Sequence, residues 1–155
     1  DLSVTQVDDA GLPYLGAFGQ LQDLSLVGNS ITDVGMVHLA MLPGLVSLRL
    51  DGTQVTDSGL SHLALLTQLA DLSLIRTEIT DAGLAEIAGF SRLEKLDISY
   101  TPISDRGLRQ LGSMKNLRVL ALFETRISPA AREELKRRLP KLAIWGPGPQ
   151  LDREP

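Results

Sequence analysis

A 24-residue repeat constrains the fold of this chain more than any other feature of the sequence. Three apolar positions recur at this spacing, without a gap, through five copies. They are Leu21, Leu45, Leu69, Leu93 and Leu117; Leu24, Leu48, Leu72, Leu96 and Leu120; and Leu26, Leu50, Leu74, Ile98 and Leu122. Apolar residues that alternate with polar ones at a period of two are typical of a short strand with one buried face. One copy cannot bury that face alone, so the repeat predicts a stack of copies with their strands side by side.

A second block of recurring residues follows each expected strand. It consists of Asn or Thr, a β-branched residue, Thr or Ser, Asp and Gly, and a helical apolar set such as Leu84, Ile87 and Phe90 comes next. The residues that stand where a helix N-cap belongs are Thr32, Thr56, Thr80 and Ser104. The aspartate after each cap falls in the first turn, where its charge meets the positive end of the helix. The block therefore predicts a short helix after every strand.

The unit LxxLxLxxTxITDxGLxxLxxLxx resembles the leucine-rich repeat family, in particular its bacterial 24-residue type. It is also similar in rhythm to the repeats of F-box-associated leucine-rich proteins. The resemblance implies an α/β fold, a right-handed solenoid with a parallel β-sheet on the concave face and short α-helices on the convex face. The chain departs from the best-known pattern because Thr stands where Asn is usual. The asparagine ladder of the family is therefore expected only at Asn29.

The repeat also predicts how the chain is divided. We expect a single solenoid over residues 1–145, with a partial N-terminal repeat at 1–20, five full repeats at 21–140 and a C-terminal cap at 129–145. Residues 146–155, rich in Gly and Pro, are expected to form an exposed tail or linker. The first copy starts inside its own strand, so upstream residues are expected in a parent protein. Pro13 predicts that the first helix begins late, near Leu12, because proline is tolerated only in a first turn.

Composition argues against several classes of function. The net charge is −4 and there is no basic run outside the last expected helix, which argues against binding duplex nucleic acid. The absence of cysteine excludes disulfides, Cys-metal sites and thiol chemistry, including a cysteine-dependent ubiquitin-ligase domain within this chain. No apolar run approaches the roughly 20 residues that a membrane span requires. Partners are therefore expected to be proteins, with no nucleic acid and no membrane span in this segment.

Two rows of potential metal ligands recur with the repeat. One is the aspartate series Asp9, Asp33, Asp57, Asp81 and Asp105, and the other is His38, His62 and Glu86. Neighbouring helices lie about 8 to 10 Å apart, too far for such rows to share one ion. We interpret the aspartates as helix-capping residues and the second row as surface residues. The sequence also lacks a nucleophile–base pair and the common catalytic motifs, so we expect no catalytic residues, no cofactor and no metal.

The residues that alternate with the buried leucines predict the exposed face of the sheet. Asp71 and Lys95 are neighbours in one row, where an ion pair is available, and Arg76 and Tyr100 are neighbours in another, where an Arg can lie on the ring. Aromatic and Arg side chains dominate protein interfaces, and Phe123 has no core to enter. The alternative for Phe123 is that missing neighbouring copies or the tail after Trp145 cover it. The residues expected to contact a partner are Arg49, Asp51, Asp71, Ile75, Arg76, Lys95, Asp97, Tyr100, Val119, Phe123 and Arg126.

Taken together, these features predict a protein–protein recognition module that binds through its concave sheet face and belongs to a larger protein. One alternative is a purely architectural segment of a longer repeat array. Another is a glycan-binding trough, against which the low aromatic content of 4% argues.

Overall fold

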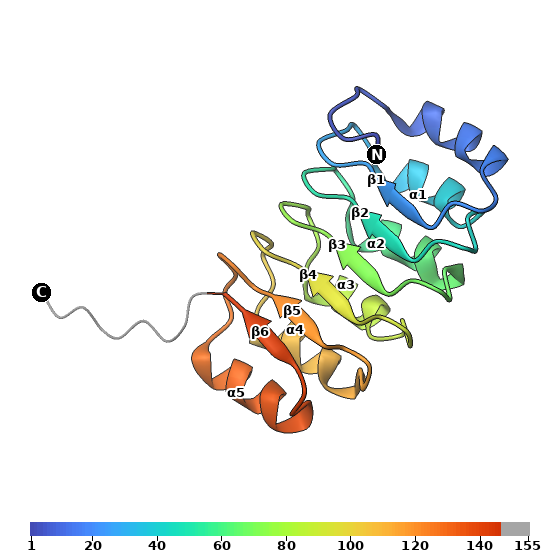
Figure 1. Ribbon diagram of the computed structural model, residues 1–155. Helices are drawn as coiled ribbons and strands as arrows, with labels where there is room; N and C mark the ends of the chain where they lie inside the picture. Colours follow the sequence, from blue (N-terminus) through green and yellow to red (C-terminus); the bar gives the residue numbers. More distant parts are fainter. Residues whose placement is uncertain (147–155) are drawn as a thin grey trace, which may run out of the picture.

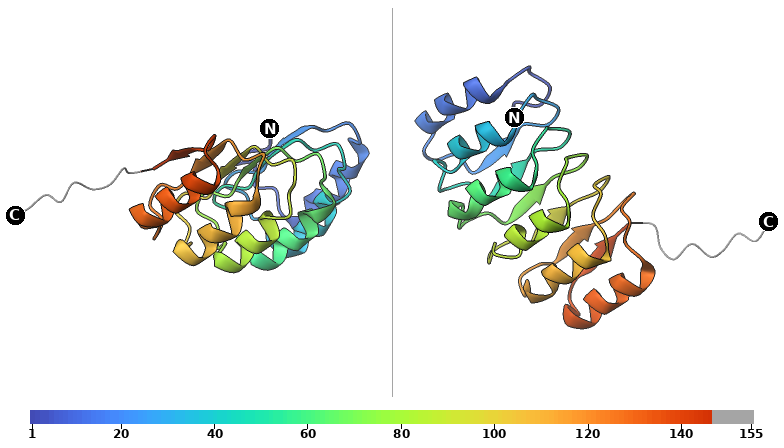
Figure 2. Two further views of the ribbon diagram at one scale, coloured as in Figure 1. Left: turned by 90° about the horizontal axis from the view of Figure 1, so that it is seen from below. Right: turned by 180° about the vertical axis from the view of Figure 1, so that it is seen from behind.

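The computed structural model describes residues 1–146 and contains one sheet of six parallel strands in the order β1-β2-β3-β4-β5-β6. Each strand is three residues long: β1 Asp23–Ser25, β2 Ser47–Arg49, β3 Asp71–Ser73, β4 Lys95–Asp97, β5 Val119–Ala121 and β6 Ala143–Trp145. The helices that connect them are η1 Asp9–Ala17, α1 Asp33–Leu39, α2 Asp57–Leu60, η2 Ser61–Leu65, α3 Asp81–Ile87, α4 Asp105–Leu108, η3 Arg109–Ser113 and α5 Pro129–Arg138, where η marks a 3₁₀ helix. The strands lie side by side on the inner face of an arc and the helices on its outer face (Figures 1 and 2). We call one strand with its following helix a rung.

The register of the sheet follows the sequence repeat at every strand pair. Leu24 pairs with Leu48, Leu48 with Leu72, and the row continues through Leu96 and Leu120 to Ile144. Leu48 and Leu72 are fully buried, so these side chains face inward as the alternation predicts. The predicted fold class is confirmed.

Leucine and isoleucine form one continuous core between the sheet and the helices. Residues that stand one repeat apart, such as Leu60 of α2 and Leu84 of α3, both lie in this core and are fully buried. Burying one such side chain contributes about 1.5 to 3 kcal/mol. Because each rung contacts only its neighbours, this stabilisation depends on the stack and not on any one rung.

The predicted helix caps are also confirmed. Thr56 accepts a hydrogen bond from the Ser58 amide at the start of α2, and the same geometry recurs at Thr32, Thr80 and Ser104. Ser128 caps α5 and accepts from the Ala131 amide, with Pro129 in the first turn. These hydroxyls satisfy amide groups that have no partner inside the helix.

The aspartates after the caps have a role beyond the predicted one. Asp33 Oδ1 accepts from the backbone N–H of Thr56 at 2.8 Å, and Asp33 Oδ2 accepts from the Thr56 hydroxyl at 2.6 Å. The same two bonds link Asp9 to Thr32, Asp57 to Thr80, Asp81 to Ser104 and Asp105 to Ser128. The capping interpretation was incomplete, because each carboxylate holds the cap of the next rung while it lies in the first turn of its own helix. We call this series the aspartate ladder.

Glycine follows four of the ladder aspartates, Asp33, Asp57, Asp81 and Asp105, because the carboxylate of the preceding rung occupies the space of a side chain. A Cβ placed on Gly59 would overlap the Asp33 carboxylate and would come within 3.0 Å of Met36. Gly35, Gly83 and Gly107 meet the preceding aspartate in the same way. The residues of the sequence Thr-Asp-x-Gly therefore act together. Thr caps its own helix, Asp binds the cap of the next rung, and Gly leaves space for the aspartate of the preceding rung.

Threonine stands where asparagine is usual in the family, and its side chain makes a hydrogen bond within its own rung only. The Thr53 hydroxyl donates to the Leu50 carbonyl oxygen at 2.6 Å, and Thr77, Thr101 and Thr125 do the same in their own rungs. Asn29 instead spans two rungs. Its Oδ1 accepts from the Thr5 and Val7 amides, while its Nδ2 donates to the Leu2 and Leu26 carbonyls. Asn29 thus joins the first, partial copy to the rest of the stack.

The first copy differs from the prediction made from Pro13. The 3₁₀ helix η1 begins at Asp9 and not near Leu12, and Asp8 caps it by accepting from the Ala10 amide. Pro13 lies inside η1. The fixed φ of proline, about −65°, matches a 3₁₀ helix, so only one hydrogen bond is missing and the helix can start before the proline.

The C-terminal rung pairs with the stack through β5 and β6, and Ala143 donates its amide to the Arg118 carbonyl at 2.8 Å. We propose that the solenoid ends near residue 145, as the repeat predicts. Of the expected tail at 146–155, residues 147–155 lie outside the described residues. Within residues 1–146, no helix has the length and apolar character needed to cross a membrane.

Candidate recognition surface

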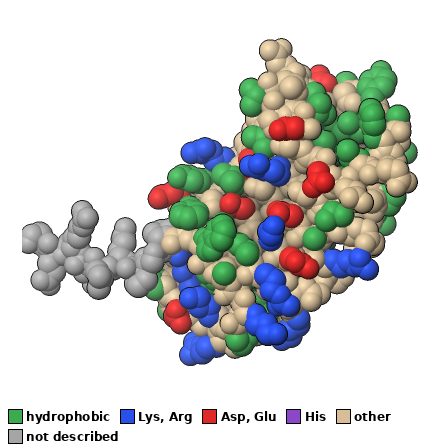
Figure 3. All heavy atoms as spheres, viewed as in Figure 1, with side chains coloured by type: hydrophobic (Ala, Val, Ile, Leu, Met, Phe, Trp, Pro, Cys, Tyr) green, Lys and Arg blue, Asp and Glu red, His purple; other side chains and the backbone are tan. Residues whose placement is uncertain are grey.

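The outward residues of β2 to β6 form a shallow trough on the concave face, with a volume of about 400 Å³. Six of the residues predicted to contact a partner line it: Arg49, Asp71, Ile75, Lys95, Asp97 and Val119. The available ion pair is present, because Lys95 Nζ lies 3.4 Å from Asp71 Oδ2 across adjacent strands. Acidic and basic side chains alternate over the middle of this face, and hydrophobic side chains gather towards its C-terminal end (Figure 3). Exposed pairs of this kind contribute under about 1 kcal/mol to stability.

Asp51 lies below the surface of the trough. Only 7% of it is exposed, and its Oδ1 accepts from the Ile75 amide at 3.1 Å and from the Ser73 hydroxyl. Its Oδ2 accepts from Arg49 Nη2 at 3.1 Å. The alternation correctly places Asp51 on the outward side, but the side chain folds back onto the next strand. Its direct effect is to fix the orientation of Arg49.

A serine positions Phe123 in a similar way. Ser99 is 2% exposed, and its Oγ accepts from the Phe123 amide at 3.1 Å, while the Ser99 amide donates to Asp97 Oδ1 at 2.9 Å. Phe123 itself is 43% exposed. The backbone that carries this ring is therefore held by buried hydrogen bonds, whereas the ring remains accessible to a partner.

One row just beyond the strands has left-handed backbone conformation in all five full repeats, and also at Val4 (φ 54°), one 24-residue step before Gly28. The φ angles are 66° at Gly28, 66° at Gly52, 54° at Arg76, 59° at Tyr100 and 52° at Glu124. In this conformation the amides of Gly52, Arg76 and Tyr100 donate to carbonyls of the following rung. Glycine adopts this conformation without strain, but at a residue with a Cβ it lowers the stability of the folded chain by about 1 to 2 kcal/mol. The stack thus uses glycine in its first two full rungs and retains large side chains, at the expense of stability, in the next three.

The side chains of this row make the contact expected from the sequence. The Arg76 guanidinium lies 4.5 Å from the centre of the Tyr100 ring, within the range of a cation–π interaction. Tyr100 is 47% exposed and Arg76 is also exposed. Arg126 lies further along the same edge, beyond the strands, where its amide donates to the Ile103 carbonyl at 3.1 Å.

Replacing Glu124 by glycine should stabilise the chain, because it removes left-handed strain from a residue whose side chain is exposed. We expect the free energy of unfolding to rise by about 0.5 to 1 kcal/mol in urea titrations. Glu133→Gly is the matched control, since the same substitution inside α5 should destabilise by about 1 kcal/mol. A fall in stability for Glu124→Gly would show that the side chain contributes more than the backbone strain removes.

One aromatic residue that lines the trough was not predicted from the sequence. Trp145 of β6 lines it and is 58% exposed. The register pairs Ala121 with Trp145, so one further 24-residue step from Ala121 leads directly to this tryptophan. The signal was therefore present, but the assignment of this strand to a C-terminal cap directed attention away from its outward side chain.

The two rows of potential metal ligands do not converge. Within residues 1–146 there is no group of three or more His, Cys, Asp or Glu side chains that could hold an ion. The ladder aspartates are instead committed to the caps of the next rung. His62 is exposed and His38 is partly buried, in keeping with their interpretation as surface residues.

A stack of 24-residue rungs with parallel strands inside and short helices outside defines a solenoid of leucine-rich repeats. The profile of the family described as Leucine Rich repeat matches residues 21–40 and 92–112. This chain is a leucine-rich repeat protein, and its structure is similar to those of bacterial members of that family.

Three solved structures illustrate the likeness. Internalin C2 from Listeria monocytogenes has a TM-score of 0.71 and 30% identity, over 87% of this chain and 55% of that one. A leucine-rich repeat protein from Leptospira interrogans has a TM-score of 0.65 and 27% identity, over 85% of this chain and 33% of that one. An internalin (inlF) from Listeria monocytogenes, at 20% identity and a TM-score of 0.54, shares the fold over 90% of this chain and 51% of that one. The chain thus spans about half or less of each. No curated protein matches it.

Proposed function

We propose that this chain is a non-catalytic recognition module that binds another protein through the concave face of its sheet. The contact would be centred on the trough and on the residues beside it at the ends of β3 to β6. Leucine-rich repeat domains typically bind proteins, which supports the general role. The choice of this face and of these residues depends on backbone strain, exposure and charge.

The observation that carries the proposal is the change of residue type along the left-handed row. Gly28 and Gly52 meet the backbone requirement without strain, whereas Arg76, Tyr100 and Glu124 meet it with φ between 52° and 59°. Strained residues of this kind cluster at functional sites, because the surrounding structure holds them for their side chains. Selection for stability alone would favour glycine in all five rungs. Retention of Arg and Tyr there supports a contact role for these side chains.

The chemistry of the surface fits a protein partner. Tyr100, Phe123 and Trp145 are 47%, 43% and 58% exposed at one end of the face. Aromatic and Arg side chains dominate protein interfaces. The trough beside them carries Asp71 and Asp97, whose charges would repel the phosphates of nucleic acid. The ion pair at Lys95 and the ring contact at Arg76 fix these side chains in advance, so less conformational freedom is lost on binding.

The double substitution Tyr100→Ala and Phe123→Ala should abolish partner binding without unfolding the chain. Both rings are exposed and contribute little to the core, so the thermal melt should be nearly unchanged. Truncating two hot-spot residues lowers affinity by about tenfold or more. The measurement is affinity capture with immobilised protein followed by chemical cross-linking, in which parent and variant are compared for the same captured proteins.

Val34→Ala with Leu65→Ala is the matched control, because these side chains are 72% and 69% exposed but lie on the helical side. This control should capture the same proteins as the parent chain. If the concave variant also retains them, or if the control loses them equally, the concave face is not the binding site.

A further inference from the structure

The charge of the chain is divided unevenly along the stack. Residues 1–105 carry four basic and fourteen acidic side chains, a net charge of −10, whereas residues 106–146 carry ten basic and three acidic ones, a net charge of +7. Lys and Arg gather over the end of the solenoid built by β5, β6 and α5 (Figure 3). This end therefore attracts anionic groups although the chain as a whole is acidic.

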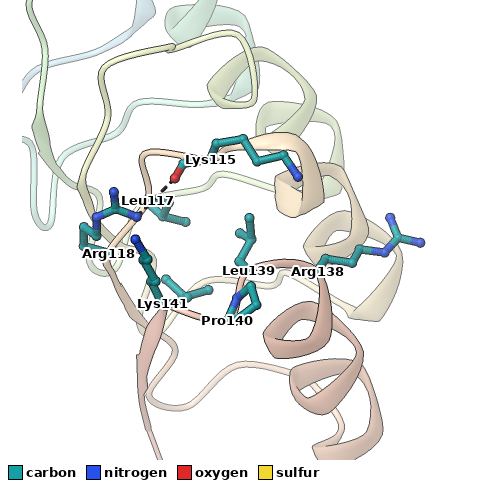
Figure 4. A pocket seen from close by; sticks show the side chains of 8 residues that line it. Lys115, Leu117, Arg118, Arg138, Leu139, Pro140 and Lys141 are labelled. Carbon is teal, nitrogen blue, oxygen red and sulfur yellow. Dashed lines mark hydrogen bonds between the residues drawn. The ribbon is translucent and has the colours of Figure 1, made fainter.

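A pocket of about 260 Å³ opens in this end, where the chain turns into β5 and β6. We call it the basic pocket. Lys115, Arg118 and Lys141 line it with cationic side chains, and Leu139 and Pro140 add apolar ones (Figure 4). Within residues 1–146 it has no lining residue in common with the concave trough, so it is a separate site.

Three cations of the basic pocket have no acidic partner among the described residues. Arg118 and Lys141 lie together on one side of it (Figure 4), and no carboxylate within residues 1–146 comes within 4.0 Å of them or of Lys115. Arg118 donates to the Lys115 carbonyl at 3.1 Å, which orients the guanidinium but leaves its charge uncompensated. Arg138, by contrast, points away from the pocket and pairs with Glu134 at 3.2 Å. Like charges held side by side favour an anion from outside.

The backbone around the basic pocket disfavours a compact phosphate. The pocket follows the C-terminal ends of η3 and α5, which present carbonyl groups and a partial negative charge. Phosphate sites use the opposite ends of helices, where amides converge on the anion. Lys and Arg side chains are long and flexible, so they can meet carboxylates spread along a chain without help from backbone amides.

The apolar lining of the basic pocket also restricts which anionic partners it can bind. Pro140 is exposed, Leu139 is buried, and the aliphatic stems of the cationic residues add apolar surface. This apolar surface lines a pocket and does not protrude, so it suits an incoming side chain better than insertion into a membrane. Among the described residues that line the pocket, none is aromatic and able to stack with a nucleic-acid base. Its volume suits one side chain and not a larger ligand.

We propose that the basic pocket binds an acidic segment of a partner protein, in which Asp or Glu carboxylates flank one apolar side chain. The carboxylates pair with Arg118, Lys141 and Lys115, and the apolar side chain lies on Pro140. This site acts independently of the concave face, so a partner can be held at two places on the solenoid.

The probe for this site is a labelled pentapeptide with one leucine between two pairs of glutamates, titrated into the full chain at about 0.1 M salt. Binding is followed by fluorescence anisotropy and by the amide NMR signals of Leu117 and Leu142, which line the pocket. The variant Arg118→Glu with Lys141→Glu should bind about tenfold more weakly or worse, because two attractive contacts become repulsive. A peptide with serine in place of leucine should bind more weakly to the parent chain.

Lys136→Glu with Arg137→Glu is the matched control, because it changes the net charge equally on exposed positions of α5 outside the pocket. This control, and the concave variant Tyr100→Ala, should bind the pentapeptide within about twofold of the parent chain. Circular dichroism melts verify that all variants are folded. Equal losses in both charge-reversed variants, an unaffected serine peptide, or no binding by the parent would each overturn the proposal. So would pocket-dependent binding of inorganic phosphate or of anionic vesicles that is tighter than that of the peptide.

Discussion

Replacing Leu72 by aspartate should abolish the cooperative unfolding transition of the chain. Leu72 is fully buried on β3, between Leu48 and Leu96 of the neighbouring rungs. A carboxylate there would have no partner, and an unpaired buried charge costs several kcal/mol. That cost is comparable with the free energy of roughly 5 to 15 kcal/mol that stabilises a whole domain. The damage also spreads, because a broken central rung separates β1 and β2 from β4 to β6, and short stacks of two or three rungs are marginal on their own.

The measurement is a thermal melt followed by circular dichroism and calorimetry. We expect the variant to show no sharp transition and a reduced heat of unfolding. Lys95→Asp is the control, since it also adds negative charge to the sheet but at an exposed position. That control should lose the ion pair with Asp71 and gain a repulsion between two exposed carboxylates, but it should retain a cooperative melt. A normal melt for Leu72→Asp would show that this residue does not face the core, and the register derived from the repeat would then be wrong.

The repeat predicted the fold well because one number determines many contacts. A 24-residue spacing places Leu24, Leu48 and Leu72 in one row, and the same step extends correctly to Ile144. Helix caps were predictable for a different reason, since the hydroxyl of a cap and the amide that it accepts from lie only two or three residues apart. Both successes depend on local chemistry repeated along a chain.

The features that were not predicted from the sequence involve side chains that bind the neighbouring rung. Asp33 was assigned to its own helix, but its carboxylate binds Thr56, 23 residues later. Asp51 was placed among the exposed residues, but it binds the Ile75 amide, 24 residues later. In both cases the repeat correctly predicted where the residue lies in its own rung. It did not predict that the side chain bends across to bind the next rung. The recurring glycine was the available signal for the ladder, because a helix needs no glycine there unless a neighbour occupies the space.

The candidate surface was predicted in part for the same reasons. The ion pair of Asp71 with Lys95 and the ring contact of Arg76 with Tyr100 follow from the 24-residue step, because the two residues of each pair stand side by side on adjacent rungs. The left-handed backbone of Arg76 and Tyr100 was not foreseen. Gly28 and Gly52 stand in the same row, and comparison with them could have indicated it. The surface that we propose for partner binding is thus defined by strain as well as by exposure.

Replacing Gly83 by alanine should destabilise the chain strongly, although it adds only one methyl group. A Cβ on Gly83 would overlap the Asp57 carboxylate and would lie 2.8 Å from Ile79 and 3.0 Å from Leu60. Asp57 would have to move, which would break its bonds to the Thr80 amide and hydroxyl. Overpacking costs about 1 to 3 kcal/mol and each lost hydrogen bond about 1 kcal/mol, so we expect a loss of about 3 kcal/mol. For a chain of this size the melting temperature should fall by about 5 to 12 °C.

Gly16→Ala is the matched control, because a Cβ there meets no described atom within 4 Å. Its melting temperature should stay within about 2 °C of the parent. A second variant, Asp57→Ala with Gly83→Ala, tests the mechanism. It removes the carboxylate that clashes, so the two substitutions together should destabilise by less than the sum of their separate effects. Strict additivity would mean that the glycine serves the helix backbone alone, and that the aspartate ladder does not explain its recurrence at Gly35, Gly59, Gly83 and Gly107.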